Sequence, residues 1–252
     1  MSGTFTPAPG RAGIATVLAR QVRMELLLTA RRGEAVVLAM GVPLLVLFGA
    51  GLTHATTLPP GNRLGYVVPG VLALTVMSTA FTGQAITTGY ERSYGVLKRL
   101  GASPLTRPGL LTAKTVAILC LVAVQVLVLA LIGVAAGWRP DVVDLGPALG
   151  VTVLATAAYS GLALLIASVL KPETTTAAAT LIYVLMLAAG GIMFATPDLG
   201  TAGWFLLPLA AHATALRDAL TDGTAIPGSI WLSLTLWAVA ALTAAARRFR
   251  WE

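Results

Sequence analysis

The residues best suited to chemistry lie in one polar segment, Glu91 to Lys114, which reads ERSYGVLKRLGASPLTRPGLLTAK between two long apolar stretches. At helical spacing its apolar side chains share one side and its basic side chains the other. Gly101 and Pro104 are expected to end this helix. The two faces are Tyr94, Val96, Leu97 and Leu100 against Arg92, Lys98 and Arg99. A charged amphipathic helix in this position is typical of an element that binds a partner.

Catalytic motifs are not found in the sequence. The string nearest to a phosphate-binding loop, Gly109 to Thr115, has Ala113 in place of the second glycine, so ATP hydrolysis is not expected of this chain. His54 and His212 have no cysteine or histidine partner at ligand spacing, and no metal site is predicted. No serine lies in the glycine-flanked turn of a hydrolase. The sequence therefore does not predict an enzyme.

Composition defines the broad class of the chain. Hydrophobic residues make up 57% and charged residues 11% of it, against about 25% charged in soluble domains. A bilayer core takes about 20 apolar residues per helix, and uninterrupted apolar runs favour helices. We predict an all-α integral membrane protein with six spans: Ala35 to Thr53, Tyr66 to Thr88, Leu110 to Ala136, Pro147 to Leu170, Thr174 to Ala195 and Gly228 to Ala246.

Basic residues predict the orientation of these spans. The formal net charge of +7 is compatible with nucleic-acid binding, but in a membrane chain it more often sets topology. With six spans, 14 of the 17 basic residues fall on the side that holds both termini. The positive-inside rule then makes both termini cytoplasmic in a multi-pass protein of the cell membrane. No nucleic-acid partner is expected.

Two segments outside the spans have helical character. Ile14 to Arg32 carries its arginines within a narrow arc, as a helix lying along the cytoplasmic interface does, although a plain topology signal explains the same arginines. The segment 196–227 holds two pieces too short to span. We expect a re-entrant helical hairpin in the outer leaflet there, with an ordinary surface loop as the alternative.

Polar residues inside the predicted spans are uncharged. All ten acids fall at membrane edges or in loops, so no carboxylate is placed to couple transport to an ion gradient. A separate ATPase is then the simplest energy source. Candidates for lining a pathway are Gln84, Gln125, Thr156 and Tyr159, although buried amides and hydroxyls commonly bond a neighbouring helix instead.

The order Glu-Arg-x-x-Gly-x-Leu-x-x-Leu-x-x-x-Pro-Leu-x-Arg, from Glu91 to Arg107, resembles the cytoplasmic coupling segment of ABC-2 type transporter permeases. That family includes drug, antibiotic and polysaccharide exporters. The string from Pro208 through His212 to Arg217 is similar to its extracellular re-entrant region. The resemblance implies that an ABC ATPase subunit contacts the coupling segment, at Glu91, Arg92, Tyr94, Gly95, Leu97, Arg99, Leu100 and Pro104.

The resemblance also implies an overall organisation. A tail and interfacial helix occupy residues 1–34, a six-helix domain residues 35–246, with the coupling segment at 91–109, and a short tail residues 247–252. The chain needs no cofactor of its own, because ATP and Mg²⁺ are expected on the ATPase. A second copy or a paralogue of the permease, and membrane lipids, are the other expected partners.

The expected function is ATP-driven export of a hydrophobic or amphiphilic compound such as a drug or antibiotic, as in multidrug efflux and antibiotic resistance. Export of lipid-linked or polysaccharide cargo, and a membrane scaffold that moves no solute, are the alternatives. The sequence leaves open the substrate and the choice between homodimer and heterodimer.

Overall fold

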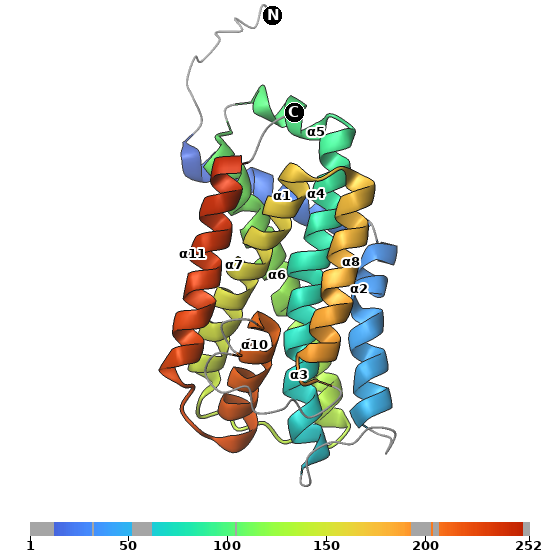
Figure 1. Ribbon diagram of the computed structural model, residues 1–252, viewed down its shortest axis with the longest axis vertical. Coiled ribbons are helices and arrows are strands. Elements are labelled where there is room, and N and C mark those ends of the chain that lie inside the picture. Colours follow the sequence, from blue (N-terminus) through green and yellow to red (C-terminus); the bar gives the residue numbers. More distant parts are fainter. Residues whose placement is uncertain are drawn as a thin grey trace, which may run out of the picture.

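The computed structural model describes residues 13–31, 33–51, 62–103, 105–192, 203 and 207–248. Every regular element in these ranges is helical (Figure 1). Five of the helices are long and apolar enough to cross a membrane: Arg63–Ser93, Arg107–Ala135, Leu145–Val169, Pro172–Ala189 and Gly228–Arg248. The expectation of an all-helical membrane fold is therefore confirmed.

The helices follow one another with short connections. Their bounds, including three π-helical turns labelled η, are α1 Ile14–Arg31, α2 Gly33–Val46, η1 Leu47–Gly51, α3 Arg63–Met77, η2 Ser78–Gly83, α4 Gln84–Ser93, α5 Val96–Gly101, α6 Arg107–Ala135, α7 Leu145–Val169, α8 Pro172–Ala189, α10 Pro208–Arg217, η3 Asp218–Asp222 and α11 Gly228–Arg248.

The elements α3, η2 and α4 form one rod at the centre of the bundle. The run from Val67 to Phe81 is buried without interruption, as expected of a helix that is apolar all round. It packs against α2, α6, α7, α8 and α10. The rod extends beyond the predicted end of the second span at Thr88, so Glu91 and Arg92 lie on its last turn.

The first predicted span, 35–53, coincides with α2 and η1, which run beside α3 (Figure 1). The apolar stretch that the structure describes there, Met40–Gly51, is shorter than a spanning helix. Residues 52 and 53 lie outside the described ranges. The described residues thus give five spans, one fewer than predicted.

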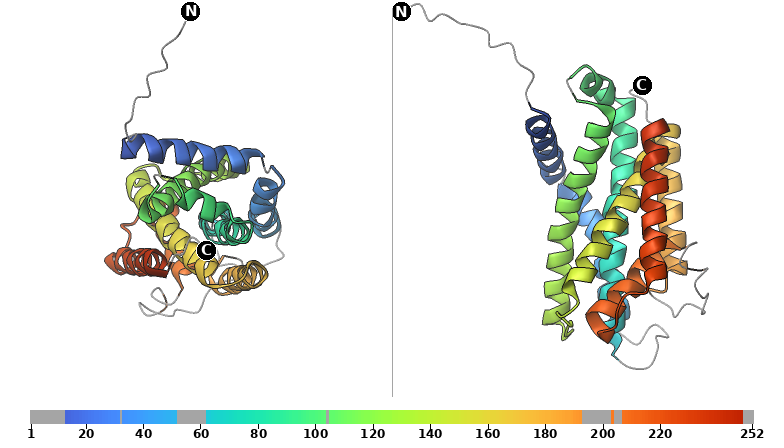
Figure 2. Two further views of the ribbon diagram at one scale, coloured as in Figure 1. Left: turned by 90° about the horizontal axis from the view of Figure 1, so that it is seen from above. Right: turned by 90° about the vertical axis from the view of Figure 1, so that its left-hand side faces the viewer.

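One end of the bundle, the basic end, carries α1, α5, the α7–α8 junction and the end of α11 (top of Figure 1). There α1 lies across the long helices and packs on α6 (Figure 2). The opposite end, the far end, holds the start of α3, the α6–α7 connection and η3. The two groups of connections therefore alternate between ends as the charge distribution predicts.

A short helix, α10, enters the bundle from the far end. It packs against α3, α7, α8 and α11, and its residues Leu209, Ala211, Ala213 and Ala215 are fully buried. Pro208 begins this helix, where its missing N–H has no partner to lose. Most of the first piece expected in 196–227 lies outside the described residues.

Candidate functional site

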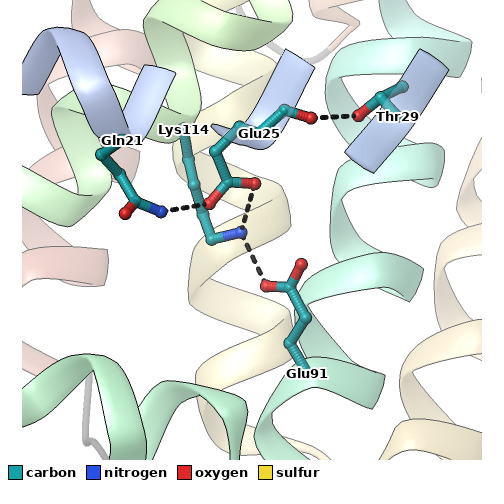
Figure 3. Close-up of polar contacts among 5 residues, drawn as sticks. All are labelled: Gln21, Glu25, Thr29, Glu91 and Lys114. Carbon is teal, nitrogen blue, oxygen red and sulfur yellow. Dashed lines mark hydrogen bonds and ion pairs between the residues drawn. The ribbon is translucent and has the colours of Figure 1, made fainter. Parts of the chain in front are cut away.

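Three helices meet in an ion cluster at the basic end (Figure 3). Lys114 of α6 places its Nζ 2.6 Å from Glu91 Oε2 of α4 and 3.1 Å from Glu25 Oε2 of α1. The Lys114 side chain is only 3% exposed. A buried ammonium is tolerated when it is paired and hydrogen-bonded, and here two carboxylates share it. The cluster therefore ties α1, α4 and α6 together.

Glu25 is held in place from its own helix. Gln21 Nε2 donates to Glu25 Oε1 over 2.8 Å, while Thr29 Oγ1 donates to the main-chain oxygen of Glu25 over 2.9 Å (Figure 3). Both partners lie four residues away, where side chains on a helix meet. The other carboxylate oxygen of Glu25 is thus directed to Lys114.

The predicted helix from Glu91 to Gly101 is divided in two. α4 ends at Ser93, and α5 begins at Val96 after the turn Tyr94–Gly95. Gly95 has φ +69°, a left-handed conformation that glycine adopts without steric cost. α5 ends at Gly101, as predicted. The amphipathic segment therefore changes direction at the basic end, which sequence periodicity alone did not reveal.

Arg92 fixes the end of the rod to the end of α7. Its Nη1 donates to Ala167 O over 2.8 Å and its Nη2 to Leu170 O over 3.1 Å. The last carbonyls of a helix lack partners within that helix and attract a cation. The predicted orienting role of Glu91 and Arg92 agrees with these contacts.

Leu97 faces the interior of the chain and is 1% exposed. It lies in the basic-end core, a buried apolar cluster of Leu97, Leu105, Leu110, Leu111, Leu164 and Ala245. Half-buried Leu100 packs against this cluster. Leu97 was predicted to contact the ATPase, but its burial gives it an internal packing role. The reason is the turn at Gly95, which directs α5 back over α6.

Tyr94 is the exposed aromatic of the segment, with 71% of its surface accessible. Its ring stacks on Tyr90 with 6.0 Å between centroids. Lys98 and Arg99 of α5 are also exposed. Pro104 lies outside the described residues. The surface available to a partner is thus aromatic and basic.

The four pathway candidates divide into two pairs. Gln84 and Gln125 line one cavity between α1, the rod and α6. Thr156 Oγ1 instead donates to Thr152 O over 2.7 Å, and Tyr159 Oη donates to Pro208 O over 3.2 Å. This second pair follows the alternative interpretation, in which buried polar groups bond their neighbours.

The residues of the far-end motif are structural contacts in this chain. Buried His212 places Nε2 3.4 Å from Thr152 Oγ1. Arg217 donates from Nε to Tyr66 O over 3.0 Å and from Nη2 to Gly191 O over 2.7 Å. Its guanidinium also lies 3.8 Å from the centre of the Tyr66 ring. Arg217 therefore joins α10 to α3 and to the end of α8.

Two residues of this region were missed by sequence reasoning. Glu25 was counted only as a charge, although it is the one acid of the basic helix α1 and lies four residues from Gln21. Tyr90 was passed over, although its spacing of four from Tyr94 places two rings together on a helix. Spacing within each helix carried both signals. The pairing of Glu25 with Lys114, 89 residues away, had no local signal.

The fold and the charge placement define a class, a multi-pass helical membrane protein with partner-binding elements at one end. The family described as ABC-2 type transporter matches residues 16–221 of the chain. The chain therefore belongs to this family: it is a permease subunit of an ABC exporter and is not itself catalytic. No curated protein matches it. Membership implies an ABC ATPase subunit as partner, typically with a second permease copy.

Proposed function

We propose that the chain forms the membrane pathway of an ATP-driven exporter that moves a hydrophobic or amphiphilic compound, such as a drug or antibiotic, out of the cell. ATP and Mg²⁺ bind a separate ATPase subunit, which docks on the basic end. Two permease copies, or this chain and a paralogue, complete the pathway. Family membership and the placement of α1 and α5 support this proposal.

The observation that carries the proposal is the ion cluster of Lys114, Glu25 and Glu91. It connects α1, which lies across the basic end, with the central rod and α6. In our proposal α1 is an interfacial helix and α5 is the coupling helix. A displacement of either helix by the ATPase would then move the rod and α6 as well.

The basic-end core gives α5 a second route into the bundle. Leu97 of α5 packs with Leu110 of α6, Leu164 of α7 and Ala245 of α11. Arg92 adds the hydrogen bonds to the end of α7. A close-packed interior transmits displacement because it has few voids to absorb it. Force on α5 therefore reaches four long helices.

The proposed membrane arrangement follows from charge and length. The basic end faces the cytoplasm in the cell membrane, together with both termini. Gly33 to Gly51 supplies the sixth span, completed by residues outside the described ranges. α10 is the returning half of the re-entrant hairpin in the outer leaflet, because ten residues are too few to cross.

The test uses Tyr94→Ala in the permease assembled with its ATPase. Exposed aromatic anchors dominate many interfaces, so we expect ATP hydrolysis stimulated by cargo, and export, to fall about tenfold or more. The melting temperature should be unchanged, because Tyr94 is mostly solvent-exposed. Val142→Ala, at an exposed apolar residue of the far end, is the matched control. Export at the normal rate by the Tyr94 variant would reject the proposed docking surface.

A further inference from the structure

We propose that the cavity between α1, the central rod and α6 binds the polar head of an amphiphile, and that this head carries a protonated amine together with hydroxyl or amide groups. The cavity has a volume of about 80 Å³, which is room for several water-sized groups. Residues lining it include Glu25, Thr79, Gln84, Thr88, Lys114 and Gln125.

Unpartnered amide and hydroxyl groups in this cavity indicate neutral hydrogen-bonding groups on the occupant. Both amide atoms of Gln84 lack a partner within the protein, as do Thr88 Oγ1 and Gln125 Nε2. Gln84 is 4% exposed, and Gln125 is 2% exposed. A buried polar atom left unpaired costs about 1–3 kcal/mol. Donors and acceptors both remain free, so hydroxyl and amide groups suit them equally.

Gln125 is oriented for this purpose by a neighbour. Thr79 Oγ1 donates to Gln125 Oε1 over 2.7 Å, which fixes the carbonyl side of the amide and leaves its NH₂ group as the free donor. Thr79 belongs to η2, a π-helical turn that also lines the cavity. Such turns in long helices are frequent at functional sites. The polar lining is therefore built from a local change in the rod.

The ion cluster supplies the charge preference. Glu25 and Lys114 both line the cavity, and Lys114 is shared with Glu91. Two carboxylates and one ammonium leave one negative charge without a partner in the cluster. A protonated amine complements that charge, whereas a phosphate or carboxylate headgroup is repelled by it.

The apolar wall accounts for the rest of the amphiphile. Ala117, Ile118 and Leu121 of α6 line the cavity, and Ile118 and Leu121 are half-exposed. Further along α6 the side chains of Val124 and Leu127 are exposed and apolar. The volume is too small for a whole amphiphile, so only its head enters, and its tail follows α6 in the lipid.

The amine has two possible sources, a molecule for export or the headgroup of phosphatidylethanolamine. Calling the occupant cargo rests on the proposed export function; binding itself does not. We therefore place the test on the purified permease without its ATPase. Loss of export in the full complex with binding retained would overturn the export function and leave this proposal intact.

The experiment measures binding of tritiated sphingosine, a long-chain amine with two hydroxyl groups, to the permease in phosphatidylcholine nanodiscs, with empty nanodiscs subtracted. N-acetylsphingosine, which lacks the charge, is the matched ligand. We expect sphingosine to bind at least tenfold more tightly than its acetylated form. Glu25→Gln should abolish that preference, because it removes the unpaired negative charge.

Variants in the polar lining test the site itself. Gln84→Leu should weaken sphingosine binding at least tenfold and Thr88→Val several-fold. Thr235→Val, at an exposed threonine on α11, should leave it unchanged. If Gln84→Leu fails to fold, as judged by its melting curve, Thr88→Val decides.

Replacing the lipid with phosphatidylethanolamine distinguishes the two sources. Competition with sphingosine assigns the site to a lipid headgroup, and undiminished binding assigns it to cargo; both outcomes support the amine site. Equal binding of the charged and acetylated ligands, binding unaffected by the lining variants, or a cavity that admits only water would overturn the proposal.

Discussion

Each end of the bundle holds a buried or half-buried cation that joins helices distant in the sequence, but the partners differ. At the basic end Lys114 binds side-chain carboxylates of two other helices. At the far end Arg217 binds the main-chain oxygens of Tyr66 and Gly191, and it covers the Tyr66 ring. The far end adds a bond from Thr221 Oγ1 to Gly65 O over 2.8 Å.

This difference suggests how motion is distributed. Long side chains that meet at their charged tips can follow one another when helices shift, because rotamer changes keep the ion pair intact. Bonds to main-chain carbonyls and close approach at Gly65, where an added Cβ would lie 2.6 Å from Thr221 Cγ2, allow no such adjustment. The basic end is therefore suited to movement, and the far end to holding α3, α8 and α10 fixed.

The largest effect is expected from Lys114→Met. Removal of the shared ammonium leaves Glu25 and Glu91 facing each other without compensation, and breaking a buried ion pair from one side costs about 3–5 kcal/mol. The free energy of unfolding should fall by that amount, and stimulation of the ATPase should be lost. Chemical denaturation in detergent and ATPase assays of the assembled transporter measure the two effects.

Lys98→Met is the control for this prediction, since Lys98 is an exposed lysine of the adjoining helix α5. It should change the free energy of unfolding by less than about 0.5 kcal/mol. The neutral combination Glu25→Gln, Lys114→Met and Glu91→Gln should regain part of the lost stability. Equal losses in the Lys114 and Lys98 variants would remove the cluster from the comparison of the two ends.

Sequence reasoning predicted what depends on local pattern. Apolar runs located the five observed spans, and basic residues placed α1, α5 and α11 at one end. The cap of α6, where Thr106 Oγ1 accepts from Gly109 N, follows from a local motif.

Long-range contacts were not predictable in the same way. The close approach of α7 and α11 at Gly161, where an added Cβ would lie 2.8 Å from the Ala241 Cβ, has no signal at the spacing of either helix. The burial of Leu97 depends on the turn at Gly95, because an uninterrupted helix would have kept it on a surface stripe. A single sequence does not record which residues meet from different helices, so the ion cluster and the cavity required the structure.

At the far end, Arg217→Met should lower the free energy of unfolding by about 2–3 kcal/mol, because hydrogen bonds from a charged donor are lost. The Tyr66 hydroxyl continues to donate to Gly191 O over 2.7 Å, which limits the loss. Arg217→Lys should recover part of it, since a lysine keeps the charge but cannot form both bonds of the fork. Differential denaturation of the three proteins measures the series.

The comparison gives the Arg217 variants a second readout. ATPase stimulation per folded molecule should stay within about twofold of normal, in contrast with Lys114→Met. A loss of stimulation as large as that of the Lys114 variant would show that the far end takes part in coupling.

A smaller effect is expected from Gly95→Ala, in the turn between α4 and α5. The left-handed backbone at this position costs an alanine roughly 1 kcal/mol, and no neighbouring atom lies within 4 Å of an added Cβ. Stability should fall by that amount, and ATPase stimulation several-fold, because α5 changes its angle. Gly228→Ala, where an added Cβ also meets nothing within 4 Å and φ is not positive, should be neutral in both assays.

The smallest effect concerns pH at the far end. Burial, and next the charge of Asp222, raise the pKa of Asp218 from 3.8 to about 6. A raised pKa means that the folded protein binds this proton more tightly, so the stabilisation is complete below about pH 4 and is lost as pH rises through about 6. Melting temperatures from pH 4 to 7 should therefore fall in the natural protein relative to Asp218→Asn. The difference should be small, because Asp218 is half-exposed and solvent screens its charge. ATPase stimulation should not follow this titration, since a fixed far end changes its stability without moving the coupling helix; stimulation that tracked Asp218 would remove the distinction between the two ends.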